Sequence, residues 1–207
     1  MNNTFILDFE TTGLNPYHDE IIEIAIKKYG EEKIYTKLTK PIKINKLPLK
    51  IIQITKITDE MLEKESININ TGFIEMMNYI IENLDNEGPI YLLAHNGTMF
   101  DFILLQQLFK NYSLINELSE SLQSIYNRFK YLDTLLLARY IIKDRYTYSQ
   151  NALAKTYLIN QNNAHRAFGD VIVLEQIFNK LIESHSINYQ LNIEDYLKID
   201  KIYSELY

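Results

Sequence analysis

Two acidic side chains lie two residues apart near the start of the chain, at Asp8 and Glu10. They end an apolar run, residues 4–9, that has the character of a buried strand. Side chains two apart on a strand share a face, so we expect both carboxylates on one side and Phe9 in the core. Neighbouring carboxylates repel unless cations lie between them. The pair predicts a site for Mg²⁺ or a similar ion, although a solvated strand end explains most isolated Asp-x-Glu pairs.

A third acid, Asp101, follows another apolar run at residues 89–94 and a polar turn. We expect it at or near the first turn of a helix, where the helix dipole favours a negative charge. Taken alone, Asp101 would be interpreted as a helix-capping or first-turn residue, which is the commoner role.

His165 and Asp170 form the last candidate segment. Histidine exchanges protons near neutral pH and is suited to taking a proton from an attacking water. Five helical residues turn through about 140°, so the two side chains would not share a face within one helix. We therefore expect His165 on a loop or first turn and Asp170 on the helix. An isolated pair at this spacing would usually be a surface pair.

The composition is that of one globular domain with a possible terminal extension. The chain has 207 residues, 46% of them hydrophobic and 23% charged, and no cysteine. Disulfides, zinc-thiolate sites and a cysteine nucleophile are thereby excluded. The start lacks the features of a signal peptide, and no apolar stretch would span a bilayer, so we expect a soluble, cytoplasmic protein. The net charge of −6 argues against a long basic surface for nucleic acid.

The order of elements predicts an α/β fold in which helices flank a mixed sheet. Strands are expected at residues 4–9, 20–28, 32–39 and 89–94 and just before Asp133, and helices at 58–62, 71–84, 99–110, 135–142, 149–157 and 167–181. Hairpins followed by strand-helix alternation favour this arrangement. We assign residues 1–185 to one domain and 186–207 to a C-terminal extension, either a packed helix or a docking tail for a partner.

Together these segments resemble the DEDDh family of 3′→5′ exonucleases, which includes the proofreading subunit of bacterial replicative polymerases. The similarity spans roughly residues 3–182 and is carried by three motifs. They are residues 5–14 with Asp8-Phe9-Glu10-Thr11-Thr12-Gly13-Leu14, then Ala94-His95-Asn96 with Phe100-Asp101, and finally His165-x-Ala167-x-x-Asp170. A single motif would be weak evidence, whereas three in the same order and spacing are strong evidence.

The resemblance implies an RNase H-like fold with a five-stranded mixed sheet, and it implies a role for each motif residue. Asp8, Glu10, Asp101 and Asp170 would bind two Mg²⁺ or Mn²⁺ ions, and His165 would activate the water. The implied substrate-binding residues are Thr11, Thr12, Gly13, Leu14, Asn96 and Phe100. Leu14 would wedge against the last bases and Phe100 would pack near the terminal sugar, unless both belong to the core. Asn96 would order the second motif or touch substrate.

The implied activity is release of nucleoside monophosphates from the 3′ end of DNA, at single-stranded or frayed ends, with proofreading as one such setting. An exoribonuclease is the first alternative, and a non-catalytic polymerase-associated or end-binding module is the second. The implied partners are a nucleic acid 3′ end and a DNA polymerase or other replication protein, with no membrane.

One further segment and two single residues have predicted roles. Residues 51–62 resemble the loop and helix that line the nucleotide pocket, and Asp133 is predicted to cap a helix rather than bind metal. Leu158 departs from the family pattern, because a glycine often ends the helix at that point.

Overall fold

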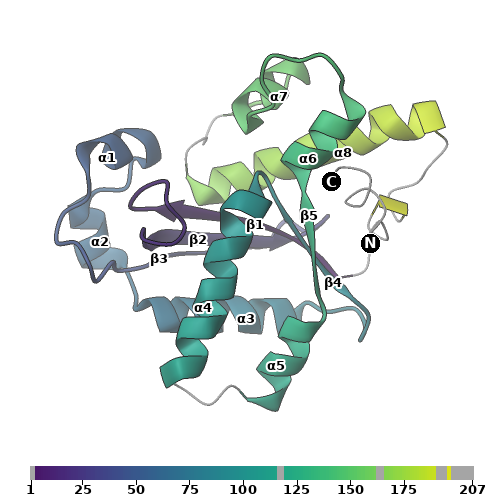
Figure 1. Cartoon of the computed structure of the whole chain (residues 1–207). Helices are drawn as coiled ribbons and strands as arrows, with labels where there is room; N and C mark the ends of the chain where they lie inside the picture. The colour runs from purple at the N-terminus through teal and green to yellow at the C-terminus, as the bar shows by residue number, and fades with distance from the viewer. Residues whose placement is uncertain (1–2, 116–118, 162–165, 190–194, 197–207) are drawn as a thin grey trace.

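The computed structural model describes residues 3–115, 119–161, 166–189 and 195–196. A five-stranded sheet with the order β3-β2-β1-β4-β5 runs through the centre of the molecule (Figure 1). Its strands are β1 (Thr4–Thr11), β2 (Ile21–Lys28), β3 (Ile34–Leu38), β4 (Ile90–Ala94) and β5 (Phe129–Asp133). The β1–β2 and β2–β3 pairs are antiparallel, and the β1–β4 and β4–β5 pairs are parallel. The prediction of a mixed five-stranded sheet is confirmed.

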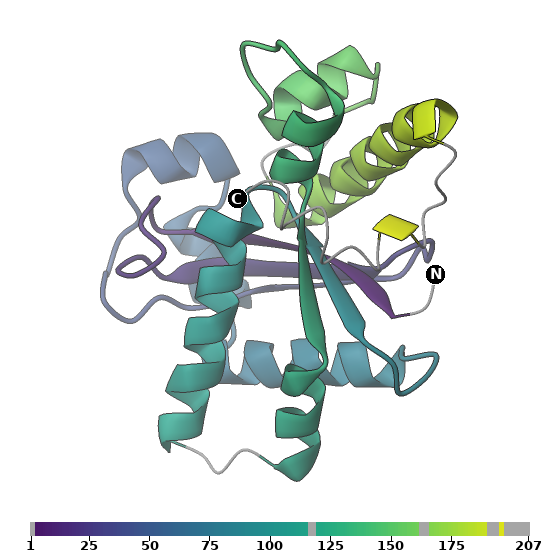
Figure 2. The ribbon, with the colours of Figure 1, turned by 45° about the vertical axis from the view of Figure 1, so that its right-hand side comes forward.

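Helices cover both faces of this sheet (Figures 1 and 2). One face carries α3 (Ile69–Glu82), α4 (Asp101–Ile115) and α5 (Glu120–Asn127), and the other carries α6 (Thr134–Ile141), α7 (Gln150–Thr156) and α8 (Ala167–Tyr189). The short helices α1 (Leu49–Thr55) and α2 (Asp59–Glu65) pack on a smaller apolar cluster with Ile22 and Leu38. A 3₁₀ turn, Gly97–Met99, lies between β4 and α4.

Strand alternation decides which face receives the acidic pair. Phe5, Leu7 and Phe9 pack into the core beneath α3 and α4, whereas Ile6 packs beneath α8. Asp8 and Glu10 continue the row of Ile6 and therefore lie on the α8 side of β1. The expected inward position of Phe9 is confirmed.

Several local predictions are confirmed by hydrogen bonds. The Thr58 hydroxyl caps α2 by accepting from the Met61 N–H at 3.2 Å. The Asp133 carboxylate caps α6 by accepting from the Leu135 N–H at 2.9 Å. Leu158 has a φ of 56°, in the left-handed region that glycine adopts at low cost, which explains the glycine expected there.

The structure contains two helices, α1 and α5, that the sequence pattern does not predict. Both are short amphipathic segments whose helical state depends on burial, through Ile51 in α1 and through Leu122 and Ile125 in α5.

Helix α8 continues to Tyr189, past the expected domain boundary at residue 185. Beyond it, Tyr196 is buried in the same apolar cluster as α8. The described part of the C-terminal extension therefore packs on the domain. Within the described residues, no helix is both long and apolar enough to cross a membrane.

Candidate active site

Three of the four predicted metal ligands meet on the α8 side of the sheet. Asp8 and Glu10 come from β1, and Asp170 comes from the first turn of α8. One carboxylate oxygen from each lies within 4.8 Å of the other two. Hard carboxylate oxygens at this separation are the donors that Mg²⁺, Mn²⁺ and Ca²⁺ prefer. The structure thus joins residues that are 160 positions apart in the chain.

Asp101, the fourth predicted ligand, lies beside this group and is turned toward the backbone. It is the first residue of α4, as expected, and its side chain is buried. Its Oδ1 accepts a hydrogen bond from the Phe9 N–H at 3.1 Å. That bond fixes the start of α4 against β1 next to Asp8. Asp101 is therefore a neighbour of the three-carboxylate group rather than a member of it in this conformation.

The site carries more negative charge than its surroundings compensate. Burial raises the pKa of Asp8 well above its usual range, and the charges of Asp101, Asp170 and Glu10 raise it further. Burial and then the charge of Asp170 raise the pKa of Glu10 to about 8. These carboxyl groups therefore favour protons or a cation between them.

Burial also raises the pKa of Asp101, to about 7, although the hydrogen bond from the Phe9 N–H lowers it. Hard oxygen donors, close spacing and uncompensated charge together fit a divalent cation.

The start of α8 is held by an ion pair that the sequence interpretation missed. Arg166 Nη2 lies 2.6 Å from Oε1 of Glu23, a buried β2 residue, and Arg166 Nε lies 3.1 Å from both its oxygens. The Glu23 carboxylate also accepts from the Ala167 N–H at 2.9 Å. The signals were a glutamate inside an apolar strand and an arginine directly after His165. This pair aligns the turn that presents Asp170.

Gln150, at the start of α7, was also missed. Its Nε2 donates to Asp170 Oδ1 at 3.2 Å and to the Asp170 backbone carbonyl at 3.1 Å. The carboxylate of the third motif is thus oriented from α7 as well as from its own helix.

Asp133 positions the second motif. Besides capping α6, its carboxylate accepts from the N–H groups of Asn96 at 2.9 Å and Thr98 at 3.0 Å. Asn96 adopts a left-handed φ of 61°, and at Gly97 an added Cβ would lie 2.7 Å from the Ala94 Cβ. These bonds show Asp133 ordering the second motif through its backbone, and whether Asn96 orders the motif or touches substrate stays a prediction. His95, expected to be structural, bonds through Nδ1 to the Thr134 hydroxyl at 2.9 Å.

The loop after β1 is closed by its own side chains. Thr11 and Thr12 are buried, the Thr11 hydroxyl donates to the Gly13 carbonyl, and the Thr12 hydroxyl donates to Asp19 Oδ1 at 3.1 Å. Gly13 packs so tightly on the Asp19 carboxylate that a Cβ would have no room. The Thr12 N–H is engaged as well, donating to the Glu20 carbonyl at 2.9 Å, so the substrate contacts of Thr11, Thr12 and Gly13 stay predictions.

A cleft of about 720 Å³ opens beside the carboxylates. Asp8 and Asp101 line it, together with the following polar and apolar residues: Leu14, Asn15, Pro16, Tyr17, His95, Asn96, Met99, Phe100 and Ile103. Leu14 is 80% exposed, so it is not core, whereas Phe100 lines the cleft and also packs on the core. Tyr17 and Met99, each 65% exposed, were missed because nothing in their local pattern marks them.

His165 lies outside the described residues, so its role as general base stays a prediction. Asp170, its expected helical companion, is on α8 as predicted.

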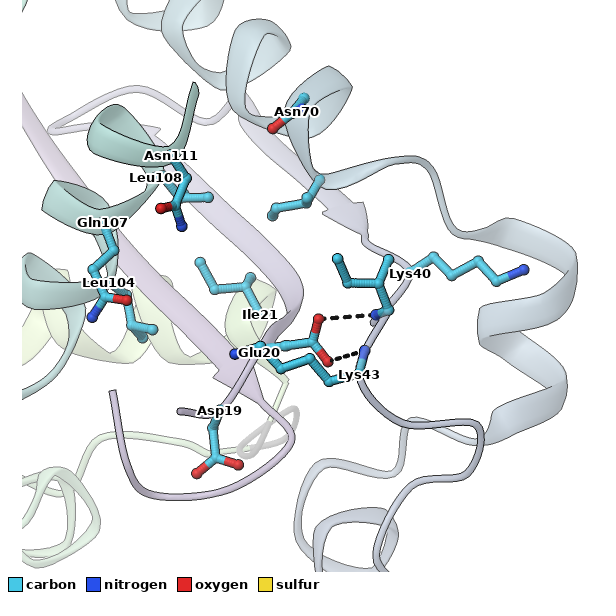
Figure 3. Close-up of a pocket in the computed structure, with 12 residues that line it drawn as sticks. Asp19, Glu20, Ile21, Lys40, Lys43, Asn70, Leu104, Gln107, Leu108 and Asn111 are labelled. Atoms are coloured by element: carbon cyan, nitrogen blue, oxygen red, sulfur yellow. Dashed lines mark hydrogen bonds between the residues drawn. The ribbon is translucent and has the colours of Figure 1, made fainter. Parts of the chain in front are cut away.

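A second, smaller cavity of about 150 Å³ lies between α4 and residues 40–43 (Figure 3). The acids in its wall are engaged: Asp19 Oδ2 accepts from the Asn15 N–H at 2.8 Å, and Glu20 accepts from two backbone N–H groups. These acids hold loops together, whereas the candidate metal ligands Asp8 and Asp101 line the larger cleft.

A mixed sheet that gathers acids at the end of its central strand defines a class of domain suited to metal-dependent hydrolysis of phosphate esters. Residues 5–178 match the model of the family RNase_T, Exonuclease, and the chain belongs to this family.

Two relatives illustrate the similarity in sequence. The DNA polymerase III PolC-type of Thermotoga petrophila is 34% identical over 187 residues, which are 88% of this chain and 12% of that protein. Exonuclease DPD1, chloroplastic/mitochondrial, of Arabidopsis thaliana is 30% identical over 199 residues, 92% of this chain and 58% of that protein. The chain thus spans only part of the length of these relatives.

Solved structures agree on the fold. E. coli Exonuclease I in complex with a dT13 oligonucleotide superposes with a TM-score of 0.70 at 17% identity, covering 91% of this chain and 42% of that one. Cell-death related nuclease 4 (CRN-4) gives a TM-score of 0.63 at 17% identity, covering 87% and 63%. The predicted RNase H-like fold is confirmed.

Proposed function

We propose that this chain is a metal-dependent 3′→5′ exonuclease that releases nucleoside monophosphates from the 3′ end of DNA. The observation that carries the proposal is the meeting of Asp8, Glu10 and Asp170 within 4.8 Å, in a member of the Exonuclease family. Complete retention of the motif acids speaks against a non-catalytic module, which has no need to gather mutually repelling carboxylates.

The four acids would hold two divalent ions, Mg²⁺ or Mn²⁺. Asp8, Glu10 and Asp170 would bind directly, and Asp101 would join them by releasing the Phe9 N–H. Such ions, when bound, offset the charge of the carboxylates, polarise a phosphate oxygen and lower the pKa of water.

The chain's own residues bind and orient the nucleotide. Leu14, Tyr17, Met99 and Phe100 give the cleft an apolar rim against which the last bases and sugar would pack. The ion pair of Arg166 keeps the third motif in place, and His165 would take the proton from the attacking water.

DNA is the substrate we propose, in preference to RNA. The support is that one relative is a DNA polymerase III of the PolC type, and that Exonuclease I, with the same fold, has been crystallised with dT13.

Incubation with 5′-labelled single-stranded DNA and RNA of one sequence tests the activity. The expected result with Mg²⁺ or Mn²⁺ is a ladder that shortens from the 3′ end, faster on DNA, and absent with EDTA or in Asp8→Asn. A folded wild-type protein that makes no ladder on either strand would refute the exonuclease, and faster RNA degradation would refute the DNA preference.

Association with a DNA polymerase is a further part of the proposal. It rests on the PolC-type relatives, in which the matching region is 12% of a longer polymerase protein. The C-terminal extension, residues 186–207, is the segment we expect to dock. Capture of the polymerase should fall on its deletion, and unchanged capture by the truncated chain would contradict this role.

A further inference from the structure

Six lysines follow one another along residues 37–56, and we call them the lysine strip. They are Lys37, Lys40, Lys43, Lys46, Lys50 and Lys56. The same 20 residues contain no aspartate or glutamate. The chain has 21 Lys and Arg against 27 Asp and Glu, so without the strip 15 basic residues face 27 acidic ones. The net charge of −6 therefore conceals a local concentration of positive charge.

The strip is exposed and not neutralised. All six lysines are exposed, and in the described part of the chain none takes part in an ion pair. The neighbouring acids of α2 are engaged elsewhere: Asp59 accepts from the Leu47 N–H at 2.8 Å, and Glu60 pairs with Lys64. Glu63 borders a shallow cavity at the strip without pairing. The strip is thus available to an external anion.

Hydrogen bonds fix the strip to the loop that forms one wall of the active-site cleft. The Glu20 carboxylate accepts from the N–H groups of Ile42 and Lys43, both at 2.9 Å (Figure 3). Lys43 Nζ donates to the His18 carbonyl at 2.8 Å. Tyr17, one residue earlier in the same loop, lines the cleft. The strip therefore begins where that wall of the cleft ends.

Exposed apolar side chains lie between the lysines. Ile42 is 78% exposed and Leu49 is 77% exposed, although burial would favour both. Figure 3 shows Lys40 extending away from the cavity wall while the backbone beside it is clamped. Surfaces that bind single strands combine cations for the phosphates with apolar groups for the bases.

We propose that the lysine strip binds the phosphates of the substrate strand on the 5′ side of the nucleotides held in the cleft. This inference rests on the proposed function and adds the path of the strand. A strand whose 3′ end lies at the carboxylates must continue over a neighbouring surface, and the strip is continuous with the cleft wall. An acidic protein would also match the charge but would have no reason to adjoin the cleft.

One lysine has another explanation. Lys37 lies on β3, an edge strand, where a lysine blocks pairing with another sheet. The variants that test the strip therefore leave Lys37 unchanged, and they also leave Lys43, which bonds to the cleft loop.

Binding is tested with the triple variant Lys40→Gln/Lys46→Gln/Lys50→Gln and a fluorescent single-stranded oligothymidylate, with EDTA present to stop hydrolysis. We expect Kd to rise about tenfold at low salt and the slope of log Kd against log salt to fall by about 2, because three phosphate contacts are lost. The matched control, Lys110→Gln/Lys130→Gln/Lys180→Gln, changes net charge equally at exposed positions outside the strip, and it should change Kd less than twofold.

Hydrolysis kinetics provide a second test of the lysine strip. With Mn²⁺, the strip variant should hydrolyse the p-nitrophenyl ester of thymidine 5′-phosphate like the wild type, because this substrate has no upstream phosphate. Its KM for the oligonucleotide should rise while kcat stays unchanged. A wild-type protein that hydrolyses neither substrate would refute the exonuclease activity. The binding measurement would still show whether the lysine strip binds the oligonucleotide.

Two results would overturn the strip as a strand-binding surface. One is equal loss of oligonucleotide affinity in both triple variants, which would reduce the effect to net charge. The other is unchanged oligonucleotide affinity in the strip variant. If that variant also lost binding to phosphatidylserine vesicles that the wild type retains, the strip would be assigned to an anionic lipid surface instead.

Discussion

Two neighbouring sets of carboxylates in this molecule have opposite surroundings: Glu23 and Asp133 are buried, and Asp8 and Glu10 are half-buried. Glu23 receives a guanidinium and a backbone N–H, and Asp133 receives three backbone N–H groups. Within the described residues Asp8 and Glu10, beside them, form no ion pair; the neighbouring carboxylates raise the pKa of both, and the charge of Arg166 offsets this rise only in part, at Glu10. The compensated acids hold the third and second motifs in place. The uncompensated ones hold a site ready for an external cation.

Asp101 is intermediate between the two sets. It accepts one backbone N–H, yet burial still raises its pKa to about 7. The buried carboxylates Glu23 and Asp133 thus have partners within the protein, whereas the half-buried Asp8 and Glu10 favour a cation from outside it.

Removing a carboxylate from the uncompensated set should give the largest effect. Asp8→Asn should lower exonuclease turnover by at least about 10³, as expected when a metal ligand is lost. In EDTA the same change should raise Tm by about 4–8 °C, because a repelling buried charge worth about 2 kcal/mol is removed. Single-turnover kinetics and thermal melts measure the two effects.

The control for that variant is Glu87→Gln, at an exposed position. It should alter neither turnover nor Tm. A metal-free Asp8→Asn protein that melts below the wild type would contradict the idea of an uncompensated cluster.

Breaking the compensated set should destabilise the protein instead. Arg166→Met leaves the buried Glu23 carboxylate without its cation, at a cost of about 3 kcal/mol, or roughly 6–12 °C in Tm. Adding Glu23→Gln should recover part of that loss. Lys180→Met breaks an exposed pair and should cost less than about 0.5 kcal/mol. If Arg166→Met and Lys180→Met melted at the same temperature, the structural role of Arg166 would be contradicted.

The pH dependence of stability should distinguish the uncompensated carboxylates from the compensated ones. The folded-state pKa values of Glu10 and Asp101 are raised to about 8 and about 7, so the folded protein binds protons that the unfolded chain has lost. Metal-free stability should be greatest in acid and fall as pH rises from about 4 to about 8, by several kcal/mol. Thermal melts in EDTA against pH measure this.

Metal should reverse that trend. Mg²⁺ should raise Tm more at pH 8 than at pH 5, because protons compete with it for the same oxygens. A metal-free Tm that rises with pH over this window would show that the acids are compensated after all.

The smallest effect is expected at Asp133. Asp133→Asn replaces one acceptor oxygen by a donor that faces the N–H of Asn96, Thr98 or Leu135, at a cost of about 1–2 kcal/mol. Turnover should fall a few-fold because the second motif loosens. Ser149→Ala, which removes the cap of α7, should cost similar stability with less effect on turnover. Equal turnover in the two variants would remove Asp133 from the positioning role.

Local sequence determined what depends on neighbours in the chain. The period of a strand put Asp8 and Glu10 on one face and Phe9 in the core, and side chains next to the backbone they cap made Thr58 and Asp133 predictable. The order and spacing of the motifs also indicated the family, and three of the four acids that they predicted as metal ligands meet.

Only the tertiary structure decided what depends on residues far apart in the chain. The crossing of α8 over β1 and β2 brings Asp170 to Asp8 and Arg166 to Glu23, and no local period encodes either distance. The helical state of α1 and α5 likewise depends on burial rather than on their own turns. The lysine strip is visible in the sequence, but its place beside the cleft follows from the hydrogen bonds of Glu20. Local periodicity fixes which way a side chain points, whereas packing between distant segments decides what it meets.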